Sequence, residues 1–207
     1  MNIAVITLKS NDKIKTLETL SCSQPHNLVF CRSLGYGKAR NDAAKTFGST
    51  GLMIQLNDDL VLSPKLWSFA LKIKRGEFGF QIVNEWVCSR VFIIHLEDYW
   101  KIGGCDNTIK YAFEDGDFYL RAIKKGLIFH SIPTELAQHI PHKHAFTYMK
   151  NIAKIDYEWT KLFVKYKRNV QHNMFRFFIN PFDYRVLFQH FVLKVTFLIY
   201  WLIHGVN

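Results

Sequence analysis

Acidic residues gather at two places in this sequence of 207 residues. Asn57-Asp58-Asp59 follows the apolar run 52–56, and Glu114-Asp115 opens a segment that ends in Lys124-Lys125. Carboxylate oxygens are hard ligands that suit magnesium or manganese, so Asp58 and Asp59 could hold a metal that bridges nucleotide phosphates. A carboxylate in the second group could act as a general base that removes a proton from an attacking hydroxyl.

Both acidic groups also have purely structural interpretations. Asn57 and Asp58 are typical turn residues that satisfy nearby backbone groups. Acids in the first turn of a helix are stabilised by the helix dipole, which accounts equally well for Glu114 and Asp115. Asp117 and Arg121 are four residues apart and are expected to form a surface ion pair.

Three histidines, His139, His142 and His144, lie within six residues of one another. Neutral imidazole is a ligand for transition metals, so one of them could complete a manganese site begun by the aspartates. Each could equally be an ordinary surface residue. The four cysteines are scattered without zinc-like spacing, and we expect free thiols.

The elements that must position these residues follow from the hydrophobic pattern. Short apolar, β-branched runs predict strands, and caps with periodic apolar residues predict helices. The predicted strands are 3–8, 27–31 and 52–56, and the predicted helices are 11–20, 38–47 and one that opens at Pro64. This alternation predicts a mostly parallel, Rossmann-like sheet flanked by helices, with ligands at the carboxyl ends of its strands.

The remaining pattern predicts more strands and then a helical tail. Residues 78–83 and 87–94 are expected to be antiparallel neighbours, followed by a helix over 114–125 and extended segments at 127–132 and 136–139. Two further helical patterns cover 146–168 and 183–204. We therefore expect a catalytic domain over 1–145 and a helical amphipathic extension over 146–207.

Charge is distributed unevenly between these two parts. The net charge is +10 overall, but residues 140–207 contribute +7 and hold nine of the 18 Phe residues. A basic amphipathic helix over 183–204 is typical of peripheral contact with an anionic membrane, although it could instead pack on the catalytic body or on a partner chain. Its longest apolar stretch, 195–203, is far shorter than the ~20 residues that span a bilayer. The short apolar run at the start is not a signal peptide, so we expect a cytoplasmic protein, peripheral on the inner membrane face.

Four segments in this order resemble the family 2 glycosyltransferases with the GT-A fold. They are Ile3–Leu8, Gly37-Lys-Ala-Arg-Asn-Asp-Ala43, Leu56-Asn-Asp-Asp-Leu-Val-Leu-Ser-Pro64, and Trp100-Lys-Ile-Gly-Gly-Cys-Asp106 with Phe113-Glu-Asp-Gly-Asp-Phe-Tyr-Leu-Arg121. The first resembles the nucleotide-binding strand, the second the Ala-Arg-Asn segment, the third the metal-binding Asp-x-Asp loop and the last the acceptor-side Glu-Asp motif. The resemblance covers about residues 1–145, and some archaeal-virus glycosyltransferases are similarly small.

The resemblance implies a function and a role for each matching residue. The chain would transfer a sugar from a nucleotide-diphosphate sugar to an acceptor hydroxyl of a glycan, lipid or protein, inverting the anomeric carbon with Mn²⁺ or Mg²⁺. Residues implied to contact the donor are Thr7, Arg40, Asp58 and Asp59, and those implied to hold the metal are Asp59, Asp58, His139, His142 and His144. Asp115 would be the base and Glu114 would position it.

Two other functional classes stay open beside this one. A non-catalytic basic protein that binds membrane or nucleic acid on a degenerate glycosyltransferase fold would use the same acids as turn and cap residues. Nucleic acid is disfavoured because residues 1–139 carry a net charge of only +3. A nucleotidyltransferase would show a glycine-rich signature after the first strand, and Thr7–Asp12 has none.

Overall fold

The structure, a computed structural model, describes residues 1–8, 15–21, 25–33, 35–83, 86–109, 113–140 and 195. The chain divides into two compact units, one of residues 1–110 with 114–141 and one of residues 111–113 with 142–207. In the second unit only Phe113 and Val195 are described, and Val195 is helical and exposed. Apart from Val195, the predicted helices of the tail lie outside the described residues, as does the domain boundary at 145, and these stay predictions.

The first unit is built on a six-stranded sheet and a separate two-stranded ribbon. The strands are β1 (Asn2–Leu8), β2 (Asn27–Ser33), β3 (Leu52–Asn57), β4 (Leu60–Leu62), β5 (Glu77–Val83), β6 (Trp86–His95), β7 (Ile128–Ile132) and β8 (Ala137–His139). The large sheet has the order β2-β1-β3-β6-β5-β7, and β4 pairs with β8 in the ribbon. The pairs β1–β2, β1–β3 and β5–β7 are parallel, whereas β6 runs antiparallel to both β3 and β5.

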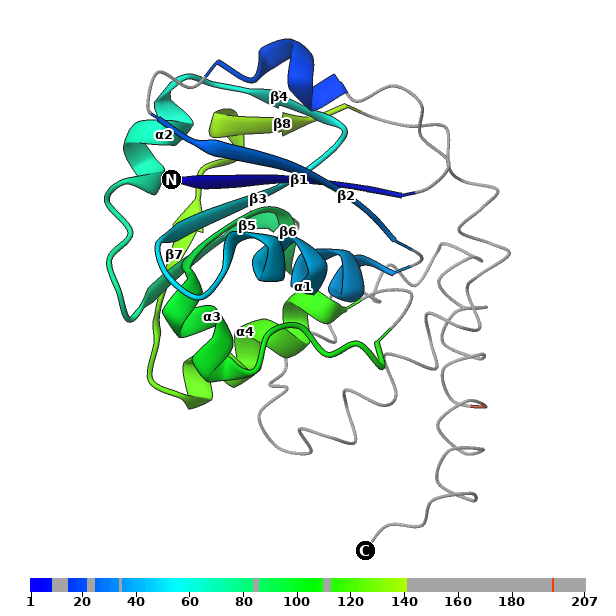
Figure 1. The fold of residues 1–207 in the computed structure, drawn as a ribbon, viewed down its shortest axis with the longest axis vertical. Helices are drawn as coiled ribbons and strands as arrows, with labels where there is room; N and C mark the ends of the chain where they lie inside the picture. Colours follow the sequence, from blue (N-terminus) through cyan, green and yellow to red (C-terminus); the bar gives the residue numbers. More distant parts are fainter. Residues whose placement is uncertain are drawn as a thin grey trace, which may run out of the picture. The chain divides into compact units, whose positions relative to one another are not determined.

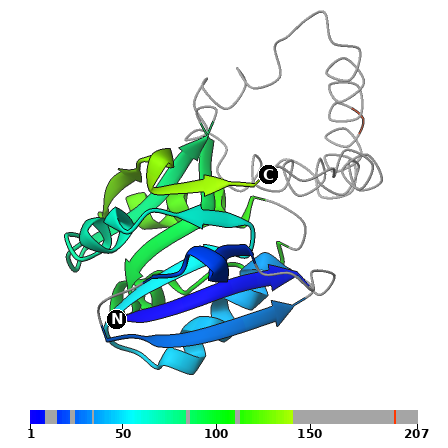
Figure 2. The same cartoon turned by 90° about the horizontal axis from the view of Figure 1, so that it is seen from above.

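Helices cover the sheet on both sides (Figures 1 and 2). They are the 3₁₀ helices η1 (Lys15–Thr19) and η2 (Thr134–Leu136) and the α-helices α1 (Tyr36–Phe47), α2 (Lys65–Ala70), α3 (Leu96–Ile102) and α4 (Glu114–Lys124). Apolar side chains of α3, α4 and the end of α1 pack on one face of the sheet, and those of α2, β4 and β8 pack on the other. No helix in the described part of the chain is long and apolar enough to cross a membrane.

Strand β1, in the interior of this sheet, has apolar side chains on both faces because both faces are covered there. Ile3, Val5 and Ile6 of β1 are all fully buried. An aromatic cluster fills one side, where Phe118 of α4 lies 4.9 Å from Phe92 and 5.4 Å from Tyr99, measured between ring centroids. This packing holds α4, and therefore its first turn, against the sheet.

Most of the predicted elements are present with slightly different ends, and the predicted antiparallel pair is confirmed as β5 and β6. Within the predicted helix 11–20 the structure describes a 3₁₀ helix over Lys15–Thr19, in which the Thr16 and Thr19 hydroxyls accept the backbone N–H groups of Leu60 and Leu62. The short elements β4, α3 and η2 were not predicted. The three cysteines that the structure describes are free, as expected.

The ion pair between Asp117 and Arg121 differs from the prediction. Arg121 Nη2 lies 2.7 Å from Asp117 Oδ2, but Asp117 is fully buried and the pair is not on the surface. Arg121 also donates to the carbonyl of Ile102 and stacks over Phe118. The pair therefore ties α4 to the end of α3.

Truncation of Phe118 to alanine tests the role of the aromatic cluster. We expect Phe118→Ala to lower the free energy of unfolding by about 3–5 kcal/mol, because a fully buried ring is lost and a cavity remains. Ile123→Ala, at a position 42% exposed on the same helix, should cost less than about 1 kcal/mol. Urea unfolding of both variants measures this, and equal losses would show that α4 is not anchored by its inner face.

Candidate active site

The loop after β3 carries the first acidic group and is held from two sides. The backbone amide of Ile140 donates to the carbonyl of Asp59 at 2.9 Å, directly after β8. The antiparallel register pairs Leu60 with His139, which brings His139 Nε2 to 3.1 Å from Asp59 Oδ2. The structure thus joins two predicted metal ligands that are 80 residues apart in the sequence.

Thr16 supports this loop from the other side, and sequence reasoning missed it. Its hydroxyl donates to the carbonyl of Asn57 at 2.7 Å and accepts the backbone N–H of Leu60 at 2.9 Å. Its backbone amide donates to the carbonyl of Asp58 at 3.2 Å. Three hydrogen bonds from one buried residue therefore define the path of the acidic loop between β3 and β4.

Glu114 and Asp115 open α4, as predicted, and both carboxyl groups are held close to the sheet. Glu114 is only 6% exposed, and its burial, followed by the charge of Asp115, raises its pKa to about 7. Burial also raises the pKa of Asp115, against the opposing effect of hydrogen bonds from Ser89 and Gly116. A carboxyl group with a raised pKa is a stronger base when ionised, which suits proton removal.

Ser89 of β6 contacts both of these acids and was not predicted. Its backbone N–H donates to Asp115 Oδ2 at 3.0 Å, and its hydroxyl lies 3.3 Å from the same oxygen and 3.4 Å from Glu114 Oε1. Neighbouring residues Phe80 and Gln81 of β5 pair with Phe92 and Cys88, so residues 89–91 form a bulge in β6. Bulges re-aim side chains next to functional sites, and here the bulge brings Ser89 to the start of α4.

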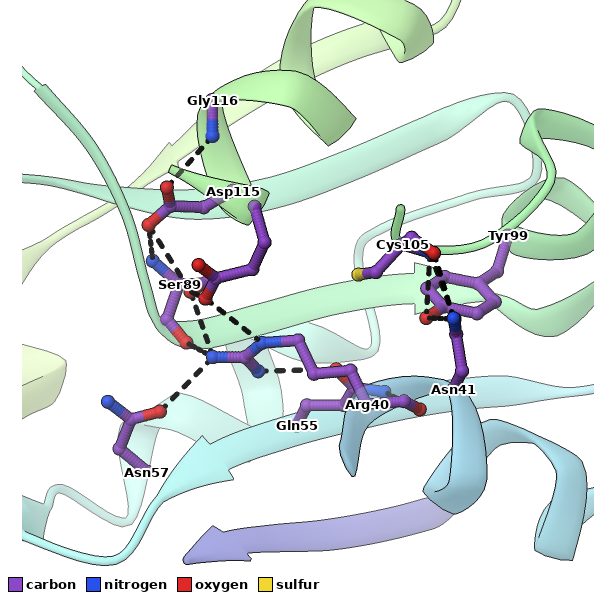
Figure 3. A network of polar contacts seen from close by, with 10 residues as sticks. Arg40, Asn41, Gln55, Asn57, Ser89, Tyr99, Cys105, Asp115 and Gly116 are labelled. Atoms are coloured by element: carbon purple, nitrogen blue, oxygen red, sulfur yellow. Dashed lines mark hydrogen bonds and ion pairs between the residues drawn. The ribbon is translucent and has the colours of Figure 1, made fainter. Parts of the chain in front are cut away.

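Arg40 of α1 joins the end of β3 to the first turn of α4 (Figure 3). Its Nη2 donates to Asn57 Oδ1 at 3.2 Å, to the Ser89 carbonyl at 2.7 Å and to the Ser89 hydroxyl at 2.8 Å, and its Nε lies 3.9 Å from Glu114 Oε1. Nη1 donates to Gln55 at 3.2 Å. The guanidinium is 1% exposed, so the contacts that the structure shows are with the protein itself. The predicted contact between Arg40 and a diphosphate stays a prediction.

The next residue, Asn41, holds the loop between α3 and α4. Its amide donates to the carbonyl of Cys105 at 2.8 Å, and its carbonyl accepts the Cys105 N–H at 2.9 Å and the Tyr99 hydroxyl (Figure 3). A side chain at Gly104 would come within 2.6 Å of Asn41 Oδ1, and Gly104 has φ +68°. The glycine of the predicted acceptor-side segment is therefore required for close approach as well as for backbone conformation.

Tyr36, the first residue of α1, is a further member of the site that no motif predicted. It is half-buried, and its pKa is raised by burial and then by the negative charges of Glu114, Asp59 and Asp58. The pKa of this hydroxyl is therefore sensitive to the charge of both acidic groups. The only signal in the sequence that could have suggested Tyr36 is its position directly before the segment that begins at Gly37.

The remaining predicted residues are placed in part. Thr7 lies near the end of β1, where its backbone is aligned with Arg32 of β2. His142 and His144 lie outside the described residues. Among the described residues, no group of three or more His, Cys, Asp or Glu side chains is arranged to hold a metal ion. Asp59 and His139 nevertheless supply one carboxylate and one imidazole at contact distance, a donor pair that fits manganese if other ligands come from a bound diphosphate.

Comparison with known proteins supports the fold of this unit. No family model matches the chain, and no curated protein matches its sequence. The catalytic domain of Drosophila beta1,4-galactosyltransferase 7, solved with xylobiose, matches with a TM-score of 0.53 and 12% identity over 69% of this chain and 72% of that chain. The mannosyltransferase PcManGT from Pyrobaculum calidifontis, solved with GDP-Man and Mn²⁺, matches with a TM-score of 0.58 and 10% identity over 99% of this chain and 76% of that chain.

These similarities show a fold and not a family, because the identities are low. The chain has the mostly parallel central sheet with flanking helices that is found in GT-A glycosyltransferases. The predicted fold class is confirmed for the described residues.

The raised pKa of Glu114 predicts how stability depends on pH. A carboxyl group that binds its proton more tightly in the folded state favours folding at low pH. That contribution is lost as the pH rises from the ordinary value of 4.5 to about 7, which corresponds to about 3 kcal/mol. We expect Glu114→Gln to remove this loss, so that its stability changes less between pH 5 and pH 8 than that of the wild type.

Urea unfolding at pH 5 and pH 8 measures the effect. Glu135→Gln, at an exposed glutamate of η2, is the matched control and should keep the wild-type pH dependence. If the stability of Glu114→Gln changes as much between pH 5 and pH 8 as that of the wild type, the pH dependence does not come from Glu114.

Proposed function

We propose that this protein is a glycosyltransferase that moves a sugar from a nucleotide-diphosphate sugar to an acceptor hydroxyl. The observation that carries the proposal is the network around Arg40, which connects the Asn57 end of the β3 loop with the Glu114–Asp115 pair. One acidic group could bind the donor while the other could activate the acceptor. The GT-A fold of the two matched structures, both glycosyltransferases, supports the same reaction class.

Asp115 is the proposed general base. Its carboxylate is held at both oxygens, with Oδ2 accepting the Ser89 N–H and Oδ1 accepting the Gly116 N–H at 2.8 Å. The group is only half-buried, whereas Glu114 beside it is buried. Asp115 therefore takes the proton from the acceptor hydroxyl as that oxygen attacks the anomeric carbon, and direct displacement inverts the configuration there.

Glu114 positions this base and adjusts its charge. Its Oε1 lies 3.9 Å from Arg40 Nε and 3.4 Å from the Ser89 hydroxyl. The negative charge of Asp115 disfavours ionisation of the neighbouring Glu114, so the two carboxyl groups titrate as a pair. Transfer should accordingly decline as the pH falls below the range in which this pair ionises.

Asp59 and His139 are the residues that would hold Mn²⁺ or Mg²⁺, with Asp58 and Asn57 beside them. A divalent cation at this position supplies positive charge to the diphosphate leaving group. The donor itself would lie at the carboxyl ends of β1 and β3, where parallel strands of an α/β sheet bind ligands. Manganese and a nucleotide sugar are present in one of the matched structures, which supports this part of the proposal.

The acceptor is proposed to be a sugar hydroxyl, since one matched structure was solved with xylobiose. Peripheral membrane contact through residues 183–204 and a cytoplasmic location stay predictions from the sequence.

Substitution of the proposed base should abolish transfer without abolishing donor binding. We expect Asp115→Asn to lower kcat by about 10²–10⁴-fold, because asparagine cannot accept the acceptor proton. Calorimetric binding of the donor should stay near the wild-type value. Asp42→Asn, at an exposed aspartate of α1 paired with Lys38, is the matched control and should transfer normally. If Asp115→Asn transfers sugar at nearly the wild-type rate, a residue other than Asp115 is the base.

Metal-dependent donor binding should require Asp59 and His139. Thermal-shift and calorimetric titrations with UDP-, GDP- and dTDP-sugars, with and without Mn²⁺, identify the donor for the wild type. We expect Asp59→Asn and His139→Ala to weaken the metal-dependent part of this binding by more than about tenfold, since each removes one metal ligand. His26→Ala, at an exposed histidine before β2, should bind as the wild type does. If a folded wild-type protein binds none of these sugars, the proposed function is wrong.

A further inference from the structure

Ser89 contacts Arg40, Glu114 and Asp115, although a residue that only forms part of a strand needs none of these contacts. It is 4% exposed and lies on the bulge of β6, where its carbonyl and hydroxyl both accept Arg40 Nη2. Its backbone N–H and its hydroxyl both point to Asp115 Oδ2. A single buried residue therefore contacts the cation on one side and the acidic pair on the other (Figure 3).

The hydroxyl group has only one proton to donate. Because it accepts from Arg40 at 2.8 Å, its proton is directed away from the guanidinium and toward the carboxylates. Asp115 Oδ2 at 3.3 Å and Glu114 Oε1 at 3.4 Å are its two possible acceptors. Polarisation by the cation strengthens whichever of these hydrogen bonds is made.

We propose that Ser89 is a positioning residue that keeps the Asp115 carboxylate oriented and ionised for proton removal by linking it to Arg40. The inference rests on the proposed function, because it assigns Ser89 a part in the same reaction. Arg40 itself does not contact Asp115 in any hydrogen bond that the structure describes, and the serine bridges the two. The backbone N–H of Ser89 orients the Asp115 carboxylate, whereas the Ser89 hydroxyl links this carboxylate to Arg40.

The hydrogen bonds from Ser89 lower the pKa values of both Glu114 and Asp115, against the larger opposite effect of burial. Loss of the hydroxyl should therefore raise the pH at which the acidic pair ionises. The backbone contact would persist in an alanine variant, so the effect should concern ionisation and rate more than donor binding. Position 89 can accordingly be tested separately from the metal and donor residues.

The experiment compares the full-length wild type with Ser89→Ala, Ser89→Thr and the control Ser131→Ala, an exposed serine of β7. Carboxyl ¹³C NMR titration follows Glu114 and Asp115 without any need for activity, with the resonances assigned from Glu114→Gln and Asp115→Asn. In parallel, the pH profiles of kcat and KM are measured with the UDP-, GDP- or dTDP-sugar that the wild type binds.

We expect Ser89→Ala to shift the titration of the acidic pair upward by about one pH unit and to lower kcat at pH 6 by about tenfold, with an unchanged KM for the donor. Ser89→Thr keeps the hydroxyl and should stay close to the wild type, as should Ser131→Ala. If Ser89→Ala does not fold, Ser89→Cys carries the same expectation, because a thiol of similar size is a weak donor.

An unchanged titration in Ser89→Ala overturns the inference whether or not any sugar is transferred. Equal defects in the alanine and threonine variants also overturn it, because they would show a packing role. A shifted titration in a protein that transfers no sugar would support the link between Ser89 and the acids and would overturn the proposed function instead.

Discussion

The buried guanidinium of Arg40 is the interaction on which the site depends. A charged group that is 1% exposed must be compensated by hydrogen bonds and by an opposite charge, or the folded state becomes unstable. Arg40 obtains these contacts from Gln55 and Asn57 of β3, from Ser89 of β6 and from Glu114 of α4. Three separate elements are therefore held at fixed positions around one helix, and the cation contacts both Glu114 and Asn57, the residue before Asp58.

Burial also changes the pKa values of the acidic pair, Glu114 and Asp115. Glu114 and Asp115 are adjacent in sequence, and placing both near a covered sheet raises their pKa values, while Arg40 and the Ser89 hydrogen bonds act in the opposite direction. The pKa of Glu114 rises to about 7 and that of Asp115 also rises, and a carboxylate with a raised pKa accepts a proton from a hydroxyl group more readily. Asp59 lies in a different environment, beside an imidazole and on a loop fixed by Thr16, which suits a ligand better than a base.

Much of this arrangement could be predicted from the sequence because it follows from local patterns. Runs such as Ile3–Leu8 are apolar at all positions but Thr7, which is typical of a strand covered on both faces, and the acids fall directly after a strand or at a helix start. The short elements β4 and α3 were missed, since β4 exists through its pairing with β8, and α3 through packing of Tyr99 beneath α4. Ser89 carries no signal in its own neighbourhood, because its role depends on a bulge set by two partner strands.

The sequence by itself determined most of the strands and helices in their order, the mostly parallel sheet and the positions of Asp58, Asp59, Glu114 and Asp115 along it, because hydrophobic periodicity and capping are properties of neighbouring residues. Only the tertiary structure decided that Arg40 is enclosed by protein groups, that His139 meets Asp59 across the ribbon and that Asp117 is buried. Each of these depends on contacts between residues that are distant in the chain. Burial and electrostatic coupling arise from such contacts, and no local pattern encodes them.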